Sequence, residues 1–396
     1  MGIDSDKVRA DFPILGKTIN GKPIVYFDNA CQSLRPKQVV DKIDQYYLEF
    51  PACGGRSGHS LGRKVDEEVK KSRKTLAKFF NAKENEIIFT KNTTESINLI
   101  AYGMQWKVGD CVLISDKEHN SNLIPWQQLR EKGVRLLRFR FGDIEDFESK
   151  LDKSVKLVSF VHTSNADGTT QPAEKIAKIA HGNKSIVLLD AAQSAPHKQL
   201  DMRKLGVDFM ACSGHKMLGP SGTGLLYAKE GSMEGMRPFM TGGETVIDST
   251  YDSATFEKVP NRYEAGLQHY AGIIGFGGAV EYLEKVGMKS ISEHETKLNS
   301  IITNEIGSDV QLLGPMDANE RGGMFSFNVK GVNYHEVAVL LDKTANVMIR
   351  SGMHCVHSWF HANGLDGSAR ASLYFYNTEE ECNVFVDSIR KIAKLK

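Results

Sequence analysis

Between residues 86 and 229, short apolar runs are separated by longer segments in which apolar residues recur with helical spacing. The runs do not alternate apolar and polar side chains, as at 87–89, 111–114, 156–160 and 186–189. A strand that is apolar on both sides is buried on both faces, which is typical of a parallel sheet covered by helices. The pattern therefore predicts an α/β domain, with ligands expected beyond the carboxyl ends of its strands.

The last third of the chain has a different pattern. Strands are predicted at 324–329, 346–350 and 370–374, with a helix at 335–343. A final helix is expected to begin after Thr378, because Thr378 and Glu381 have the spacing of a capping box. This mixture predicts a smaller α+β domain that begins in or near 266–287.

Charge and composition argue against several classes of partner. Lys and Arg number 50 and Asp and Glu 49, so the net charge of +1 offers no excess for nucleic acid or acidic membranes. No apolar run approaches the length of a membrane span, and the first residues lack a signal-peptide pattern. The six cysteines are scattered without a Cys-x-x-Cys pair, which suits unpaired thiols in a reducing compartment. We expect a cytoplasmic protein that binds neither nucleic acid nor membranes.

Polar side chains follow the ends of two consecutive predicted strands. Asp190 ends the run 186–189, Gln193 follows it, and Ser213-Gly214-His215-Lys216 follows the next run, at 209–211. A carboxylate, an amide and a primary amine can hold a pyridine ring by its nitrogen, its phenolic oxygen and its aldehyde carbon. The ordered set predicts a site for pyridoxal 5′-phosphate, in which Lys216 forms the Schiff base and Asp190 pairs with the pyridinium nitrogen.

Each of these residues also has a simpler interpretation. Asp190 can be a helix cap and Lys216 a surface lysine, although a carboxylate behind four apolar residues is partly desolvated and needs a cationic partner. The segment Asn92-Thr93-Thr94-Glu95-Ser96 offers amides and hydroxyls to a phosphate, but on its own it is more typical of a well-capped helix. The glycine-rich stretch 219–224 lacks the strand-before, helix-after context of a nucleotide loop, so we interpret it as a turn.

Motifs along nearly the whole chain resemble those of one enzyme family. They are Asp11-Phe12-Pro13-Ile14-Leu15, Tyr26-Phe27-Asp28-Asn29-Ala30, Thr93-Thr94-Glu95-Ser96-Ile97-Asn98, Glu118-His119-Asn120-Ser121-Asn122-Leu123-Ile124-Pro125-Trp126, Ser213-Gly214-His215-Lys216, Arg350-Ser351-Gly352-Met353-His354-Cys355 and Arg370-Ala371-Ser372-Leu373-Tyr374. With them the chain resembles the fold-type I pyridoxal-phosphate enzymes of the class V aminotransferase superfamily. Within that superfamily it resembles the cysteine desulfurases and selenocysteine lyases that mobilise sulfur for iron–sulfur cluster assembly.

The resemblance implies a fold and a division of the chain. We expect a large domain at 21–275, with a mostly parallel seven-stranded sheet between helices. A smaller α+β domain at 276–396 would carry the catalytic cysteine, and residues 1–20 would pack with it. The implied protein is a homodimer of the subgroup with a short catalytic-cysteine lobe.

The resemblance also implies roles for single residues. Lys216 would bind the cofactor and move the substrate α-proton, Cys355 would take the substrate sulfur as a persulfide, and His119 would stack on the ring. The expected cofactor ligands are Thr94, Asp190, Gln193, Ser213 and His215, and the expected substrate ligands are Asn165, Arg350 and Arg370. The implied reaction converts L-cysteine to L-alanine and passes the sulfur to an acceptor, such as an iron–sulfur scaffold protein or a small thiol.

Cys355 has two alternative interpretations. A free cysteine is often a small buried apolar residue. His357 and His361 have helical i, i+4 spacing, so with Cys355 they also suggest a metal site. The neighbouring arginine and histidines favour a thiolate, and the family assigns the cysteine to sulfur chemistry without a metal.

The chain departs from the family pattern at several positions. Leu267 stands where the family often has a threonine that reaches the partner's phosphate, so that contact is expected to be absent or moved to Gln268 or His269. Asp167 adds a carboxylate near the site, and Met353 replaces a common histidine. The segment 53–59 is unusually rich in glycine. These changes bear on substrate choice more than on cofactor binding.

Two other functions fit parts of the pattern. A selenocysteine lyase, aminotransferase or epimerase would use the same cofactor, but reactions without sulfur transfer need no thiol at Cys355. A degenerate partner that binds a sulfur-relay protein would not need the full set of Lys216, Asp190, His119 and Arg370.

Overall fold

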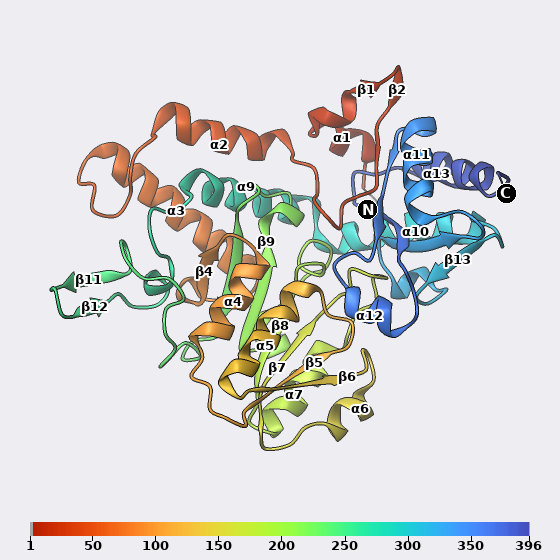
Figure 1. Ribbon diagram of the computed structural model, residues 1–396. Helices are drawn as coiled ribbons and strands as arrows, with labels where there is room; N and C mark the ends of the chain where they lie inside the picture. Colours follow the sequence, from red (N-terminus) through yellow and green to blue (C-terminus); the bar gives the residue numbers. More distant parts are fainter. Residues whose placement is uncertain (1–2, 396) are drawn as a thin grey trace.

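The computed structural model describes residues 3–395. Its centre is a seven-stranded sheet in the order β4-β10-β9-β8-β7-β5-β6 (Figure 1). The strands are β4 Ile87–Thr90, β5 Cys111–Ser115, β6 Arg135–Phe139, β7 Val155–Val161, β8 Ile186–Asp190, β9 Phe209–Ser213 and β10 Gly224–Ala228. All neighbours are parallel except β10, which runs antiparallel to both β4 and β9. The predicted α/β fold with a mostly parallel sheet is confirmed.

Apolar residues on both sides of the strands pack into two separate cores. Along β8, Leu189 belongs to one core and Leu188 to the other, because successive side chains of a strand point to opposite faces. Helices α3 (Ser60–Phe79), α7 (Ala173–Gly182) and α9 (Tyr270–Val286) cover the first face. Helices α4 (Thr93–Gly103) and α5 (Ile124–Gln128) cover the second. The lack of alternation in these strands therefore reflects burial on both faces.

A second sheet of four antiparallel strands lies in the C-terminal third. Its order is β13-β14-β17-β16. The strands are β13 Val310–Leu313, β14 Met324–Val329, β16 Arg350–Gly352 and β17 Ser368–Ser372, and the helices that pack there are α10 Met288–Glu305, α11 Tyr334–Ala345 and α13 Glu379–Ile392. Helix α13 begins at the predicted capping box, in which Thr378 accepts from the Glu381 amide and the Glu381 carboxylate accepts from the Thr378 amide. The strand predicted at 346–350 is instead divided into β15 (Val347–Met348) and β16.

The N-terminal part of the chain lies against this C-terminal region. Strand β3 (Val25–Tyr26) pairs in parallel with β15, and Val25 and Phe27 pack in the core of the C-terminal sheet. Phe12, in contrast, packs with the core of the seven-stranded sheet. The segment around Val25 therefore packs with the small sheet, although the sequence-based division placed it in the large domain.

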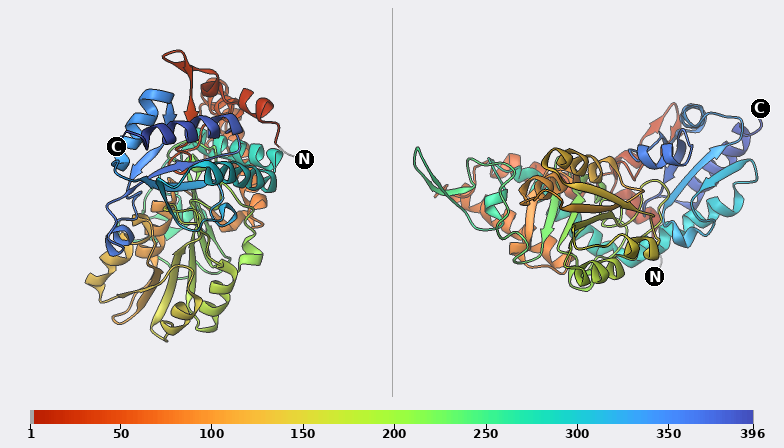
Figure 2. Two further views of the ribbon diagram at one scale, coloured as in Figure 1. Left: turned by 90° about the vertical axis from the view of Figure 1, so that its right-hand side faces the viewer. Right: turned by 60° about the horizontal axis from the view of Figure 1, so that its bottom comes forward.

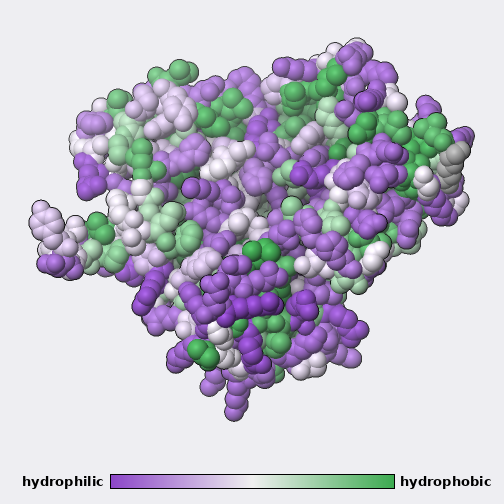
Figure 3. Space-filling model, viewed as in Figure 1, coloured by the Kyte–Doolittle hydropathy of each residue, from purple (hydrophilic) through white to green (hydrophobic). Residues whose placement is uncertain are grey.

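The other elements are short or lie at the edges of the molecule. They are α1 Ser5–Ala10, β1 Thr18–Ile19, β2 Lys22–Pro23, α2 Lys37–Glu49, α6 Ile144–Ser149, α8 Met202–Leu205, β11 Val246–Ser249, β12 Ala254–Phe256 and α12 His357–Ala362. The β11–β12 hairpin projects from the body of the molecule, as Figure 2 shows. The face seen in Figure 3 is mostly hydrophilic, with apolar residues in small groups. Within residues 3–395, no helix combines the length and apolar character needed to cross a membrane.

Candidate active site

One cavity of about 240 Å³ lies beyond the carboxyl ends of β7, β8 and β9. The N-terminus of α4 and the strands β16 and β17 contribute the rest of its wall. Every residue that the sequence analysis assigned to the site lines this cavity: Thr94, His119, Asn165, Asp190, Gln193, Ser213, His215, Lys216, Arg350, Cys355 and Arg370. The fold thus brings residues from both sheets to one place.

Asp190 and Lys216 are buried groups of opposite charge in this cavity. Asp190 ends β8, and its Oδ1 accepts a hydrogen bond of 2.9 Å from the Ala192 amide. Burial raises the pKa of Asp190, while the Ala192 amide and the Lys216 ammonium oppose that shift. Burial likewise lowers the pKa of Lys216, and Asp190 opposes it. Lys216 ends the short 3-10 helix Gly214–Lys216, which directly follows β9, so the end of this strand positions it.

His119 is a neutral imidazole at the cavity wall. Burial, together with the nearby positive charges of Lys216 and Arg370, lowers its pKa to about 3. Its Nδ1 accepts a 3.0 Å hydrogen bond from the Ser121 amide, so its proton is placed on Nε2. The adjacent Glu118 is fully buried and accepts from the Val161 amide and from Asn122 Nδ2, the latter at 2.7 Å. Burial raises the pKa of Glu118 to about 8, so its carboxyl is protonated at neutral pH.

The N-terminus of α4 forms the anion-binding end of the cavity. Asn92 Oδ1 caps the helix by accepting from the Glu95 amide at 3.0 Å. Ser213 Oγ accepts from the Thr93 amide at 2.9 Å, and Thr94 Oγ1 lies 2.7 Å from Ser121 Oγ. The interpretation of this segment as a well-capped helix is therefore confirmed. The hydroxyls and helix amides also converge at a helix N-terminus, where an anion is favoured, so the phosphate site stays a prediction.

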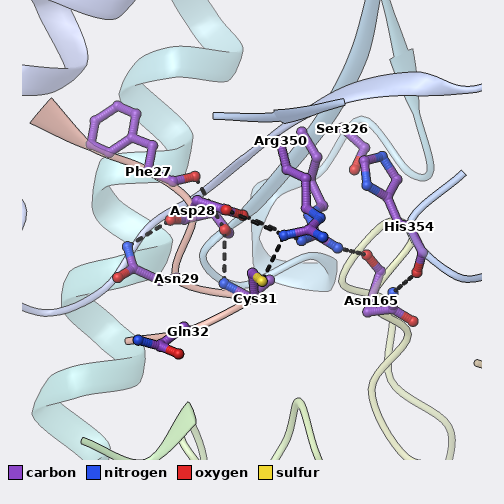
Figure 4. Close-up of polar contacts among 12 residues, drawn as sticks. Phe27, Asp28, Asn29, Cys31, Gln32, Asn165, Ser326, Arg350 and His354 are labelled. Atoms are coloured by element: carbon purple, nitrogen blue, oxygen red, sulfur yellow. Dashed lines mark hydrogen bonds and ion pairs between the residues drawn. The ribbon is translucent and has the colours of Figure 1, made fainter. Parts of the chain in front are cut away.

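The other end of the cavity carries two arginines. Arg370 is fully buried and donates from Nη1 to the Asn165 carbonyl at 2.8 Å, while Asn165 Nδ2 donates to the His354 carbonyl at 2.6 Å. The Asp28 carboxylate faces both arginines, with its oxygens 3.7 Å from Arg370 and 3.5 Å from Arg350. Figure 4 shows the contact of Asp28 with Arg350. Burial lowers the pKa of Arg370 to about 10, so it stays cationic at neutral pH.

Cys355 lies on an exposed turn between β16 and α12. Its φ is +60° and that of His354 is +51°, and its carbonyl accepts from the Asn120 amide at 2.8 Å. His357 Nδ1 faces Asn120 Nδ2 at 3.1 Å. No group of three or more His, Cys, Asp or Glu side chains within residues 3–395 is arranged to hold a metal ion. His357 thus contacts a loop of the large sheet, whereas His354 Nε2 lies 2.9 Å from Ser368 Oγ in β17.

Sequence reasoning did not single out three residues of this site. Asp28, Cys31 and His354 hold or line the cavity, and all three stand within or next to motifs that carry the family resemblance. The sequence signal that could have identified Asp28 is its carboxylate, which stands within one of these motifs. The added carboxylate Asp167, expected near the site, is ion-paired with Lys117 at 2.7 Å. Leu267, Gln268 and His269 lie around a different hollow, beside Glu264.

The polar groups of the cavity fit pyridoxal 5′-phosphate. Gln193 is buried, and Nε2 donates one of its two hydrogens to the Ala30 carbonyl, while its Oε1 has no partner. Nε of Arg370 is buried without a partner as well. A buried carboxylate, a buried amine, an amide with a free donor and a hydroxyl-lined helix N-terminus are the groups that the ring and its phosphate require.

The comparisons with known proteins point to one family. The family described as aminotransferase class-V matches residues 25–385. A probable cysteine desulfurase of Synechocystis sp. is 41% identical, over 97% of this chain and 94% of the relative. A cysteine desulfurase of Haloferax volcanii is 37% identical, over 99% and 98%. The apo structure of a cysteine desulfurase from Thermococcus onnurineus superposes with a TM-score of 0.95, 37% identity and coverage of 100% of this chain and 99% of that one.

Proposed function

This chain belongs to the aminotransferase class-V family, and we propose that within this family it works as a cysteine desulfurase that uses pyridoxal 5′-phosphate. The substrate would be L-cysteine, and the products L-alanine and a persulfide on Cys355. One observation carries the proposal: a single cavity holds the lysine–aspartate pair, the two arginines and an exposed thiol. The full-length relatives named as cysteine desulfurases support it.

We assign the cofactor's contacts to the inner end of the cavity. Asp190 would hold the ring nitrogen, Gln193 the phenolic oxygen, and Lys216 the aldehyde carbon. Thr94, Ser213 and His215 would hold the phosphate. When bound, the ring supplies an electron sink that stabilises negative charge on the substrate's α-carbon.

The remaining steps fall to the side chains of this chain. Arg370 and Asn165 would bind the substrate carboxylate, because a guanidinium can donate two parallel hydrogen bonds to it. Burial favours the neutral amine of Lys216, which is the form that takes up the α-proton. The Cys355 thiolate then attacks the substrate sulfur: a sulfur–sulfur bond forms, the carbon–sulfur bond breaks, and its electron pair stays on the carbon, which takes up a proton.

The oligomeric state, the cellular compartment and the sulfur acceptor belong to the same proposal. We infer a cytoplasmic homodimer that passes its sulfur to an acceptor protein for iron–sulfur cluster assembly. The alternative is a selenocysteine lyase or another class-V enzyme such as an aminotransferase or epimerase. The exposed position of Cys355 in the cavity favours sulfur transfer, since the latter reactions need no thiol.

The test is alanine and sulfide release from L-cysteine by the cofactor-loaded protein with a thiol reductant. The Cys355→Ala variant is compared with Cys53→Ala, which removes an exposed cysteine outside the cavity. We expect equimolar alanine and sulfide from the wild type and from Cys53→Ala, and neither product from Cys355→Ala. Equal alanine from both variants would contradict the persulfide. Selenide release from L-selenocysteine, with no turnover of L-cysteine, would favour the selenocysteine lyase.

A further inference from the structure

A second thiol lines the same cavity as Cys355. Cys31 follows β3, is partly buried, and its amide donates to the Asp28 carbonyl at 3.1 Å. Its sulfur accepts from Nη1 of Arg350, the arginine that also pairs with Asp28 (Figure 4). A guanidinium against the sulfur offsets the negative charge of a thiolate, which is the attacking form of cysteine.

The sulfurs of Cys31 and Cys355 influence the pKa values of the same two side chains. A negative charge on either Cys31 or Cys355 raises the pKa of Lys216, and either one also raises the pKa of Arg370. Both thiols therefore lie within electrostatic range of the same two basic groups, Lys216 and Arg370.

The other cysteines do not share this position. Cys111 and Cys212 are buried within β5 and β9, and Cys382 is buried in α13. Cys53 is exposed but does not line the cavity. Among the cysteines, only Cys31 combines access to the cavity of Cys355 with a cation at its sulfur.

We propose that Cys31 is a second sulfur-accepting thiol, which takes the outer sulfur from the Cys355 persulfide; this rests on the proposed desulfurase function. The Cys31 thiolate attacks the outer sulfur of the protonated persulfide. A bond forms between Cys31 Sγ and that sulfur, the bond from that sulfur to Cys355 Sγ breaks, and its electron pair leaves on Cys355 as a thiolate. The proton stays on the transferred sulfur, so the step needs no oxidant or reductant.

The transfer has a measurable consequence. It returns Cys355 to the thiolate that a second L-cysteine requires, while the first sulfur stays in the cavity. Without acceptor or reductant, the cofactor-loaded enzyme should form about two alanines per chain in its initial burst, against about one in Cys31→Ala. The matched control Cys53→Ala should keep the wild-type burst.

The experiment measures the alanine burst from L-cysteine and locates sulfur by mass spectrometry of alkylated peptides. We expect one extra sulfur on the Cys31 peptide of the wild type and none on Cys31 in Cys355→Ala, because the sulfur arrives through Cys355. The wild-type peptide map keeps the test valid even if Cys31→Ala folds poorly.

Three outcomes would overturn the proposal. Extra sulfur on Cys355 alone, with a burst of about one alanine in the wild type, would show that Cys31 takes none. A disulfide between Cys31 and Cys355 with release of sulfide would show attack on the inner sulfur instead. If neither the wild type nor any variant forms alanine, the desulfurase function is wrong and the transfer to Cys31 fails with it. The first two outcomes contradict only the transfer to Cys31.

Discussion

Lys117 Nζ lies 2.7 Å from Asp167 Oδ2, and both side chains are buried. The ammonium also lies over the rings of Phe141 and Trp359, at 4.7 and 4.8 Å from their centroids. Asp167 follows the turn of Asn165, and Trp359 belongs to α12, directly after Cys355. Lys117 therefore joins the loop before His119 to the turn of Asn165 and to the helix after Cys355.

We expect Lys117→Met to lower the free energy of unfolding by about 3–5 kcal/mol, because it leaves the buried Asp167 carboxylate unpaired. Urea unfolding followed by fluorescence measures the change. The double variant Lys117→Met/Asp167→Leu should regain most of that loss, since an apolar pair leaves no charge behind. If the losses of the two single variants simply add in the double variant, the two residues are not coupled.

Replacement of Lys216 tests the assignment of the cofactor lysine. Lys216→Ala should lose the visible absorption of the bound cofactor and at least about 100-fold in alanine formation, because it removes both the attachment point and the base. Circular dichroism should stay that of the wild type. Lys198→Ala, at a partly buried lysine outside the cavity, is the control and should keep the absorption. An unchanged absorption band in Lys216→Ala would refute the assignment.

Arg370→Lys should weaken substrate binding. An ammonium cannot donate two parallel hydrogen bonds to a carboxylate, and losing a hydrogen bond to a charged group costs about 1.5–3 kcal/mol, or roughly 10–100-fold in KM. Steady-state kinetics with L-cysteine measure the change, and Arg390→Lys at the surface serves as the control. If Arg370→Lys and Arg390→Lys have equal KM values, the substrate carboxylate binds to a group other than Arg370.

The protonated carboxyl of Glu118 should make stability depend on pH. Its pKa is raised from 4.5 to about 8 in the folded protein, so the folded state binds the proton more tightly than the unfolded one. The stabilisation that this proton provides is complete below pH 4.5 and is lost as the pH rises through about 8. Glu118→Gln, which mimics the neutral carboxyl, should lack this loss. The unfolding free energy of the wild type should therefore fall relative to that of Glu118→Gln as the pH is raised from 5 to 9. A difference that does not change with pH would contradict the raised pKa of Glu118.

Gly224 should be necessary for the anion-binding end of the cavity. A Cβ atom at this position would lie 2.5 Å from Asn92 Cα, so Gly224→Ala must displace the N-terminus of α4. We expect a loss of about 1–3 kcal/mol in stability and weaker binding of the cofactor phosphate. Titration with pyridoxal 5′-phosphate measures the affinity. Gly182→Ala, where a Cβ meets nothing within 4 Å, is the control and should bind as the wild type does.

Much of the fold and site could be predicted because local signals and topology agree. The doubly buried strands, the capping box at Thr378 and the position of Asp190 at a strand end are all properties of neighbouring residues. Parallel strands place their carboxyl ends at one edge, so Asp190 and Ser213 meet without any knowledge of strand order.

The rest depends on contacts between distant segments, which leave no periodic signal. No sequence pattern near Asp28 indicates that its carboxylate will contact Arg350 and Arg370, which lie more than 300 residues further along the chain. The antiparallel direction of β10 and the pairing of Lys117 with Asp167 are likewise tertiary properties. The sequence around Cys31 indicated no role for this residue, apart from its position directly after the motif Tyr26-Phe27-Asp28-Asn29-Ala30.

The pairing of β3 with β15 also governs the order in which a newly made chain can fold. Val25 leaves the ribosome early, but its partner Val347 is synthesised only after most of the chain has been made. At typical rates of translation the interval is roughly tens of seconds, during which the seven-stranded sheet can form while β3 and Phe27 wait unpaired. The wall that carries Arg350, Arg370 and Cys355 is therefore completed last. The proposed sulfur transfer, which needs Arg370 and Cys355, would therefore begin only after the C-terminal strands have been made, even when Lys216 is already in place.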